Sequence, residues 1–263
     1  MLRAKEITKS YGGPQILNQV SFVLDTGKMM GVIGPNGSGK TTLVRLLSGE
    51  EKPDQGTIYF RDRPLSTFTI RELAQQIAVL PQGGLPPLPF TVQDVVMMGR
   101  YPHQKRWLPP TKEDWRIVSE VLEELQLTKY KDRPLDQLSG GERQRVAMAK
   151  VMAQKPKLLI LDEPTTYLDI GYQVAILDII QLWQQKQTLS VLIVLHDLNL
   201  AAQYCDRLII MKNGKIIKNG SPTEVLQPVI LKDVYGIEPL LTQHPTAKVP
   251  QVLLQSSIEW KVG

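Results

Sequence analysis

The sequence predicts an α/β fold in which a mostly parallel sheet is flanked by helices and carries an antiparallel β subdomain and an inserted helical lobe. The parallel sheet is predicted by the aliphatic runs 158–161 and 191–195, which are too apolar for strands with one solvated face. Segments 4–8 and 16–24 flank a Gly/Pro turn, and the second alternates apolar and polar residues, which predicts the antiparallel part. Helical spacing of apolar residues between 92 and 125 predicts the lobe.

The composition sets outer limits on the class of protein. The 263 residues suffice for one or two domains, and 42% hydrophobic residues are ample for a core. No apolar run approaches the roughly 20 residues that cross a bilayer, and residues 1–6 lack the apolar stretch of a secretory signal. The single cysteine, Cys205, excludes an internal disulfide. The net charge of +5 suits an anionic ligand or a membrane surface, but no basic run is long enough to indicate nucleic acid, and we expect a cytoplasmic location.

The strongest motif is a glycine-rich loop that matches the pattern Gly, four residues, Gly-Lys-Ser/Thr. Its residues are Gly34, Pro35, Asn36, Gly37, Ser38, Gly39, Lys40, Thr41 and Thr42. The glycines let consecutive backbone N–H groups face inward and form a nest for phosphate oxygens. Lys40 can reach the β- and γ-phosphates, and the hydroxyl of Thr41 can bind Mg²⁺. Because a predicted strand, 29–33, precedes the loop and a predicted helix, 41–47, follows it, we expect the phosphate loop (P-loop) of an NTPase core that binds a nucleotide.

An aromatic residue stands before the first turn. Tyr11 precedes Gly12-Gly13-Pro14, so its ring can project and stack on a nucleotide base. An ordinary half-buried tyrosine at a sheet edge fits this position equally well.

The border of the lobe is marked by the sharpest change in composition. Segment 81–89 is rich in proline and glycine, which excludes regular structure. Thr91 and Thr111 then stand at helix starts, and Thr111 has Asp114 at the spacing of a capping box. Between these helices, the connector 99–107 is basic and aromatic and looks exposed. We expect a single domain over 1–263, divided into an α/β core with its β subdomain at 1–89 and 137–238, a helical lobe at 90–136 and a C-terminal extension at 239–263.

A second possible anion site opens the helix after the lobe. Ser139, Gly140, Gly141 and Glu142 start this predicted helix, where free N–H groups and a hydroxyl stand without bulky side chains in the way. A plain serine N-cap explains the serine but not the paired glycines.

Two acidic residues follow the predicted central strand 158–161. Ligands bind at the carboxyl ends of strands in open α/β sheets, which places Asp162 and Glu163 near the phosphates. Asp162 would hold Mg²⁺ directly or through water, and Glu163 would polarise an attacking water. An acidic pair more commonly caps a helix. His196 ends the strand 191–195 at the same rim, so we expect it to contact the γ-phosphate, with a helix cap as the alternative.

The remaining segments carry weaker signals. A helix with an inward face is predicted from Val174, Leu177, Ile180 and Trp183. Asn213-Gly214 between apolar runs predicts a hairpin over 208–218, and a short strand is expected within 251–260.

In their order and spacing these motifs resemble the nucleotide-binding subunit of an ATP-binding cassette (ABC) transporter. The resemblance covers residues 3–225 and rests on the phosphate loop, a glutamine after a strand, Leu-Ser-Gly-Gly-Glu, Leu-Leu-Ile-Leu-Asp-Glu and Leu-His-Asp. It implies that the chain binds ATP and Mg²⁺, with Thr41, Gln82 and Asp162 around the ion.

The resemblance also assigns roles to single residues. They are the adenine-stacking Tyr11, the loop glutamine Gln82 that senses Mg²⁺ and the permease, the signature Ser139 to Glu142 that contacts ATP held by the opposite subunit, the catalytic Glu163, the dimer-contact Asp169 and the switch histidine His196. Two departures from the family pattern are Glu142, where glutamine is commoner, and Thr-Tyr-Leu-Asp at 166–169 in place of Ser-Ala-Leu-Asp. Neither departure removes a catalytic group.

A finer resemblance concerns cargo and partners. Residues 91–96, leading into 99–104, look like the importer branch that handles iron–siderophores, haem and vitamin B12. It implies a second copy of the chain, separate transmembrane permease subunits and, indirectly, an external substrate-binding protein, on the cytoplasmic face of the (inner) membrane as a peripheral subunit. No nucleic acid is expected. The alternatives are an importer ATPase for another substrate and a soluble ABC ATPase acting on nucleic acid or ribosomes. We also hypothesise that segment 90–107 docks a permease helix through Met97, Met98, Tyr101 and Trp107.

Overall fold

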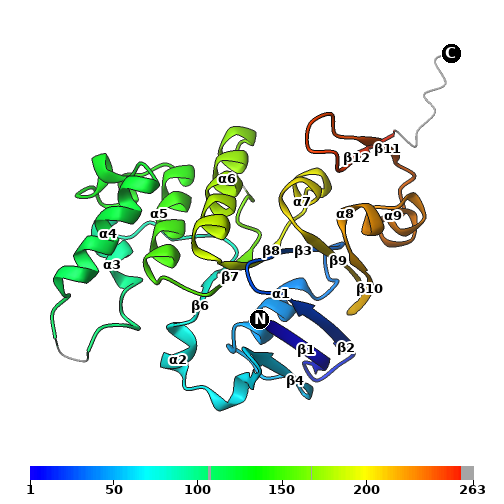
Figure 1. The fold of residues 1–263 in the computed structure, drawn as a ribbon, viewed down its shortest axis with the longest axis horizontal. Coiled ribbons are helices and arrows are strands. Elements are labelled where there is room, and N and C mark those ends of the chain that lie inside the picture. Colours follow the sequence, from blue (N-terminus) through cyan, green and yellow to red (C-terminus); the bar gives the residue numbers. More distant parts are fainter. Residues whose placement is uncertain (106–107, 167, 256–263) are drawn as a thin grey trace.

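Figure 1 shows a computed structural model of the protein, which describes residues 1–105, 108–166 and 168–255. The helices and strands are β1 (Leu2–Ser10), β2 (Gln15–Leu24), β3 (Met29–Ile33), α1 (Lys40–Leu47), β4 (Gln55–Phe60), β5 (Arg63–Pro64), η1 (Leu65–Thr67), α2 (Ile70–Ala74), β6 (Ile77–Leu80), α3 (Val92–Met98), α4 (Lys112–Glu124), η2 (Thr128–Tyr130), η3 (Leu135–Gln137), α5 (Gly140–Ala153), β7 (Leu158–Asp162), α6 (Ile170–Gln187), β8 (Ser190–Val194), α7 (Leu198–Tyr204), β9 (Arg207–Lys212), β10 (Lys215–Gly220), α8 (Pro222–Val225), α9 (Pro228–Tyr235), β11 (Leu240–Gln243) and β12 (Pro250–Leu253). The described residues leave out 106–107, 167 and 256–263. Trp107, Tyr167 and the second half of the strand expected within 251–260 are among those left out.

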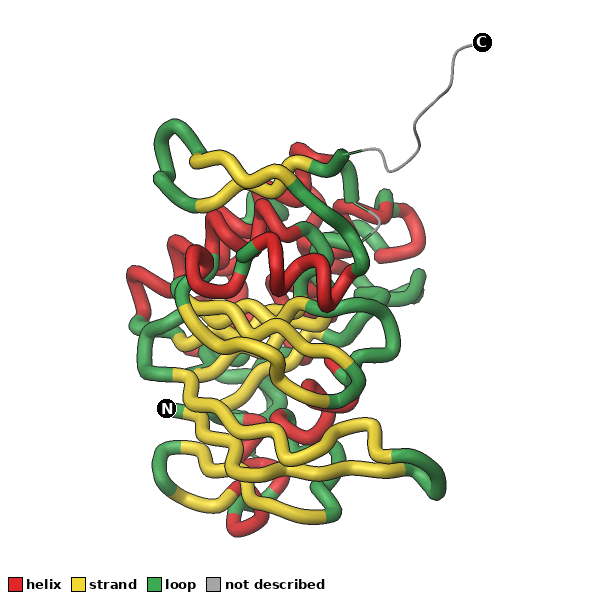
Figure 2. Tube along the Cα trace, turned by 90° about the vertical axis from the view of Figure 1, so that its right-hand side faces the viewer, coloured by secondary structure: helices red, strands yellow, loops and turns green. Residues whose placement is uncertain are grey.

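Two main sheets and a layer of helices make up the fold. The larger sheet has the order β10-β9-β3-β8-β7-β6, and its strands are parallel except for β10, which pairs with β9 in the predicted hairpin. The smaller sheet, β2-β1-β4-β5, is antiparallel. In Figure 2 the antiparallel sheet lies at the bottom, the larger sheet above it, and most helices above that. The predicted α/β class with a mostly parallel sheet and an antiparallel addition is confirmed.

The central strands are buried on both faces, as their uninterrupted apolar runs predict. In β7, Leu158 and Ile160 face the core that contains α1 and the antiparallel sheet, whereas Leu159 and Leu161 face the core beneath the other helices. All residues of β3, β7 and β8 are buried. These strands are parallel, so their carboxyl ends lie at the same edge of the sheet. The loops that follow them therefore meet at that edge.

The helices α3 and α4 pack against α5, and α5 also packs against β6 (Figure 1). A buried ion pair ties this lobe together: Nε of Arg100 lies 2.9 Å from Oδ1 of Asp114, and Nη1 of Arg100 donates to the carbonyl of Ala153 at 2.7 Å. Despite burial, which raises it, the pKa of Asp114 is lowered by hydrogen bonds from Thr111 and Arg100. The expectation that the connector 99–107 is exposed is therefore wrong for Gly99 and Arg100, which are buried, and 102–104 are half-buried.

One further position differs from the sequence prediction, and the single cysteine can now be placed. Val174 was expected on the inward face of α6, but its side chain is 37% exposed, whereas Leu177, Ile180 and Trp183 are buried. The inward stripe of α6 therefore begins one turn later than predicted. Cys205 is buried at the end of α7, and a Cβ on Gly31 would stand 2.8 Å from its Sγ, so β3 passes directly beneath the thiol.

Candidate nucleotide-binding and catalytic site

The phosphate loop joins the carboxyl end of β3 to the start of α1, as predicted. Gly34 has φ +150°, and a Cβ there would stand 2.3 Å from the carbonyl oxygen of Met211. Gly39, at φ +100°, caps α1, and a Cβ there would stand 2.8 Å from the carbonyl oxygen of Ile16. Glycine is required at both positions because the neighbouring backbone leaves no room for a side chain. The loop therefore packs its backbone closely against the backbone of Ile16 and Met211.

Lys40 is the cation of this loop. Its Nζ donates to the carbonyls of Gly34 and Pro35 at 2.9 and 3.0 Å, so the side chain folds back over the loop. Burial lowers the pKa of Lys40, and the carboxylates of Glu163 and Asp162 act in the opposite direction. The lysine is thus held above the nest, facing both acidic residues.

Asp162 is the last residue of β7 and is 3% exposed. Its Oδ1 is buried and has no hydrogen-bond partner among the described residues. Burial and the charge of Glu163 raise the pKa of Asp162, while the hydroxyl of Thr41 acts to lower it. A buried carboxylate oxygen without a partner costs free energy unless a cation completes it. Asp162 and Thr41 supply hard oxygen ligands of the kind that Mg²⁺ prefers, so these residues fit that ion.

Glu163 stands in the turn after β7 with φ +53°, a left-handed conformation that costs a non-glycine residue about 1 to 3 kcal/mol. Both carboxylate oxygens are contacted. Oε1 lies 2.6 Å from Nε2 of His196, and Oε2 accepts from Nε2 of Gln82 at 2.7 Å and from Oγ1 of Thr166 at 3.3 Å. The structure therefore brings together three of the predicted residues, from the ends of β6, β7 and β8.

These side chains surround one cleft with a volume of ≈ 570 Å³. It is lined by Ile16, Asn36, Gly37, Gly39, Lys40, Thr41, Thr42, Gln82, Glu163, Thr166 and His196. Residues of the phosphate nest, Lys40, the hydroxyl-bearing Thr41 and the carboxylate of Glu163 thus face a common space, whereas Asp162 is buried and does not line it. This arrangement suits binding of a polyphosphate and activation of a water beside it.

Tyr11 lies outside the lining of this cleft, with its side chain 53% exposed. Its hydroxyl donates to Oε2 of Glu51 at 2.5 Å, and Nζ of Lys9 lies 5.3 Å from the centroid of its ring. Burial and the bond to Glu51 raise the pKa of Tyr11. The ring is thus held in place at its polar tip, and its stacking on adenine stays a prediction.

Ser139 is the N-cap of α5 and forms a complete capping box with Glu142. The backbone N–H of Ser139 donates to Oε2 of Glu142 at 2.8 Å, and the N–H of Glu142 donates to Oγ of Ser139 at 3.3 Å. Hydrogen bonds from Tyr130 and from Ser139 lower the pKa of Glu142 to about 2. Glutamate therefore fills the role that a glutamine has in a capping box, which gives a physical reason for this departure from the family pattern.

Ser139, Gly140, Gly141, Glu142 and Asp169 do not line the cleft around Lys40. Asp169 is exposed and caps α6 by accepting from the N–H of Tyr172 at 2.9 Å. Within one chain, the predicted residues therefore fall into two groups. One lies around the cleft that contains Lys40, and the other lies at the starts of α5 and α6.

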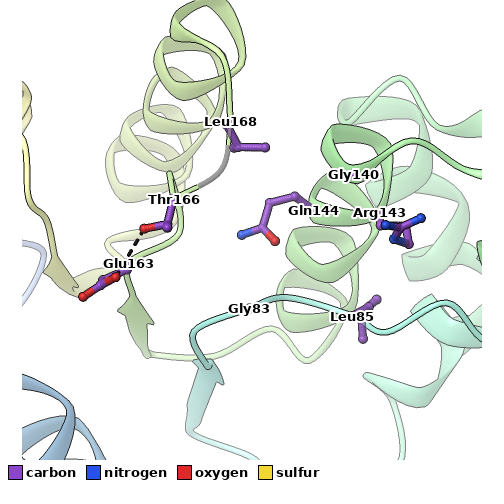
Figure 3. Close-up of a pocket in the computed structure, with 8 residues that line it drawn as sticks. All are labelled: Gly83, Leu85, Gly140, Arg143, Gln144, Glu163, Thr166 and Leu168. Carbon is purple, nitrogen blue, oxygen red and sulfur yellow. Dashed lines mark hydrogen bonds between the residues drawn. The ribbon is translucent and has the colours of Figure 1, made fainter.

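Two residues that contact the turn carrying Glu163 are not among the predicted site residues. Thr166 lines the cleft and donates to Glu163, and its place three residues after that glutamate in a turn could have indicated it. Gln144 on α5 donates to the carbonyl of Pro164, a contact between distant segments that no local spacing predicts. Figure 3 shows both side chains around the turn that carries Glu163.

The chain belongs to the ABC transporter family, because residues 17–166 match the family model of that description. As a member, it is an ATP-binding subunit of a family whose ATP hydrolysis is coupled to transport. Among the described residues, no helix combines the length and apolarity that a membrane span requires.

Curated relatives align over nearly all of the chain. The hemin import ATP-binding protein HmuV of Thermobifida fusca is 40% identical over 253 residues, which are 96% of this chain and 88% of that protein. The iron(3+)-hydroxamate import ATP-binding protein FhuC of Bacillus subtilis is 36% identical, over 98% of this chain and 96% of that protein. The ABC transporter ATP-binding protein YvrA of Bacillus subtilis is 37% identical over 97% of this chain, but the chain spans only 58% of the length of YvrA.

Solved structures of ABC transporter proteins have the same fold as this chain. A chain of a metal-chelate type ABC transporter in an inward-facing conformation superposes with a TM-score of 0.84 at 26% identity, with 97% of both chains covered. A dimeric ATP-binding cassette bound to ADP and phosphate gives a TM-score of 0.74 at 25% identity, with 84% of this chain and 99% of that chain covered.

Proposed function

We propose that this chain is the Mg²⁺-dependent ATP-hydrolysing subunit of an ABC importer for iron–siderophores, haem or cobalamin. The observation that carries the catalytic part is the carboxylate of Glu163, held at the rim of the phosphate cleft by His196 at 2.6 Å and Gln82 at 2.7 Å. The names of relatives, among them hemin, ferric hydroxamate and ferric enterobactin importers, support iron chelates or haem as cargo. Cobalamin rests on the sequence resemblance alone.

The chain's own residues perform binding and proton transfer. The backbone of residues 34–42 and Nζ of Lys40 bind the phosphates, and Lys40 must leave its two carbonyl partners to do so. Glu163 accepts the proton of the attacking water, and His196 and Gln82 fix the direction of its carboxylate. Phosphoryl transfer depends mainly on positioning and charge stabilisation, which these contacts supply.

The ion would be held by Asp162 and Thr41, with the amide oxygen of Gln82 as the third group from this chain. Nε2 of Gln82 donates to Glu163, so the amide oxygen takes no part in that bond, and Gln82 lines the cleft. When bound, Mg²⁺ neutralises charge that develops on the phosphate oxygens.

A second copy of the chain completes the site. The capped serine and glycines at 139–141 stand at the start of a 14-residue helix, yet they lie outside the cleft of their own chain. A symmetric partner that presents its Ser139 and Asp169 across the cleft would close it, and the similarity to a dimeric cassette supports this arrangement. Hydrolysis would then depend on closure of the dimer.

The permease would be a separate set of transmembrane subunits that receives the movement of the lobe. The chain would act at the cytoplasmic face of the inner membrane as a peripheral subunit, with an external substrate-binding protein as an indirect partner. We expect no nucleic acid as partner. The divisions 1–89, 90–136, 137–238 and 239–263 are proposed as its functional parts.

The test is isolation of the tagged chain from membranes of its source with the polypeptides that accompany it. We expect transmembrane permease subunits, and vesicles containing the complex should take up a radioiron-labelled siderophore or haem only with ATP inside. Lys40→Ala in the same complex is the matched control. Assembly with permease but uptake of another solute would reject the cargo, whereas co-isolation with ribosomes or DNA would reject the transporter function.

A further inference from the structure

We propose that Gln144 is a positioning residue for ATP hydrolysis, which couples the placement of helix α5 to the orientation of Glu163. The inference rests on the proposed ATPase function. Gln144 lies one turn into α5, the helix that Ser139 caps. Its side chain leaves the helix toward the turn that carries Glu163 and Thr166 (Figure 3).

The first contact of Gln144 is with that turn. Its Nε2 donates to the carbonyl oxygen of Pro164 at 2.9 Å. Pro164 is buried and directly follows Glu163, whose backbone is left-handed. The carbonyl of Pro164 belongs to the second peptide plane after Glu163. A hydrogen bond to it therefore restrains the turn just beyond this strained residue, and through the turn the direction of the Glu163 carboxylate.

The second contact is with the loop that carries Gln82. Oε1 of Gln144 lies 2.4 Å from the position that a Cβ on Gly84 would take, and Gly84 has φ +64°. The backbone of this loop therefore packs directly against the amide group. One side chain thus touches both segments whose residues, Gln82 and Glu163, are hydrogen-bonded to each other.

The setting allows movement at this contact. A cavity of ≈ 180 Å³ adjoins it, lined by Gly83, Leu85, Gly140, Arg143, Gln144, Glu163, Thr166 and Leu168. This space means that α5 and the turn are not joined by dense packing here, so the hydrogen bond from Gln144 to Pro164 would carry a displacement of one to the other. An apolar side chain at position 144 would fill the same space but would not make this connection, because it has no donor for the carbonyl of Pro164.

The test compares Gln144→Met, which keeps length but has no donor, with Gln144→Glu, which keeps shape but accepts only when ionised. Both full-length variants should keep the ATP-dependent rise in melting temperature and a KM for ATP within about twofold, while kcat falls roughly tenfold, the effect of about one lost hydrogen bond. The matched control is Gln154→Met, because Gln154 caps the other end of α5 and donates to the carbonyl of Ile77 at 2.7 Å. It should lower the melting temperature and leave kcat within about twofold of wild type.

A pH series distinguishes positioning from packing. A protonated glutamic acid can donate to the carbonyl of Pro164, so the rate of Gln144→Glu relative to wild type should rise as the pH falls toward 5. The corresponding ratio for Gln144→Met should stay flat. Wild-type kcat in Gln144→Met, equal loss of kcat in Gln154→Met, or flat ratios for both variants would overturn the inference. Absence of ATP hydrolysis in the wild-type complex would instead reject the proposed function itself.

Discussion

Nε2 of His196 lies 2.6 Å from Oε1 of Glu163, and this contact links the ends of two neighbouring parallel strands, β8 and β7. Gln82, from the end of β6, holds the other carboxylate oxygen at 2.7 Å. Three adjacent strand ends thus converge on one carboxylate. Because a carboxylate has about four acceptor positions, it can keep these partners and still accept the proton of a water.

Replacing Glu163 by glutamine should leave ATP binding intact and lower the turnover of ATP on the order of 10²–10⁴-fold, the contribution of a positioned acid–base group. The amide keeps its contact with His196 but cannot accept the proton. Steady-state phosphate release measures the rate, and size-exclusion chromatography with ATP should show an accumulated dimer. Nearly wild-type hydrolysis by the pure variant would assign the base to another residue.

Lys40→Ala should abolish the rise in melting temperature on addition of ATP, which at 100-fold excess over Kd corresponds to roughly 2.7 kcal/mol for one site. Ser139→Arg should keep this rise, since Ser139 lies outside the cleft of its own chain, but it should eliminate hydrolysis. Differential scanning fluorimetry and an ATPase assay on the same samples decide between the two effects. Equal loss of ATP binding in both variants would show that the signature does not serve the opposite subunit.

Asp162→Asn should raise the melting temperature of the protein without nucleotide and Mg²⁺ at neutral pH. The substitution removes a buried charge whose Oδ1 has no partner among the described residues. It should also remove the additional stabilisation that Mg²⁺ gives to the ATP-bound protein. A lower melting temperature in Asp162→Asn would mean that the carboxylate is compensated by a contact that the described residues do not provide.

Glu142→Gln should preserve hydrolysis, because either side chain completes the capping box with Ser139. The two proteins should differ in their response to acid. The pKa of Glu142 is lowered from 4.5 to about 2, so the ionised side chain stabilises the native state above pH 4.5, and this stabilisation is lost as the pH falls toward 2. Urea unfolding between pH 5 and pH 2 should show a steeper loss of unfolding free energy in wild type than in Glu142→Gln. Parallel curves would contradict the assigned role of Glu142.

Tyr101→Ser should reduce assembly with the permease and transport together, while the basal ATPase of the isolated subunit persists. Tyr101 is 61% exposed beyond α3, whereas Met97 is buried and Met98 packs against the core, so the docking hypothesis now depends on Tyr101. Trp107 lies outside the described residues. Trp115→Ser, on the exposed face of α4, is the control and should change neither property. Unchanged transport in Tyr101→Ser would contradict the hypothesis that segment 90–107 docks a permease helix.

The sequence predicted the phosphate loop and the strand-end acids well because both follow from local pattern. Parallel strands end at one rim, so Lys40, Glu163 and His196 had to meet once the strands were recognised. The burial of Arg100 and the exposure of Val174 could not be predicted in this way, because helical periodicity does not reveal which neighbour covers a face. The contact of Gln144 with Pro164 joins segments 20 residues apart and depends on the packing of α5 against the core.

The burial of Cys205 at the end of α7 also decides how movement in this protein can be followed. Burial raises the pKa of its thiol, and the thiolate is the form that reacts with alkylating probes. The thiol of Cys205 should therefore not react with these probes, and only introduced cysteines would be labelled. Cysteines introduced at the exposed positions Trp115 on α4 and Ile217 on β10 would carry a pair of spin labels. The distance between these labels, with and without ATP, would report the displacement of the lobe from the sheet in ångströms.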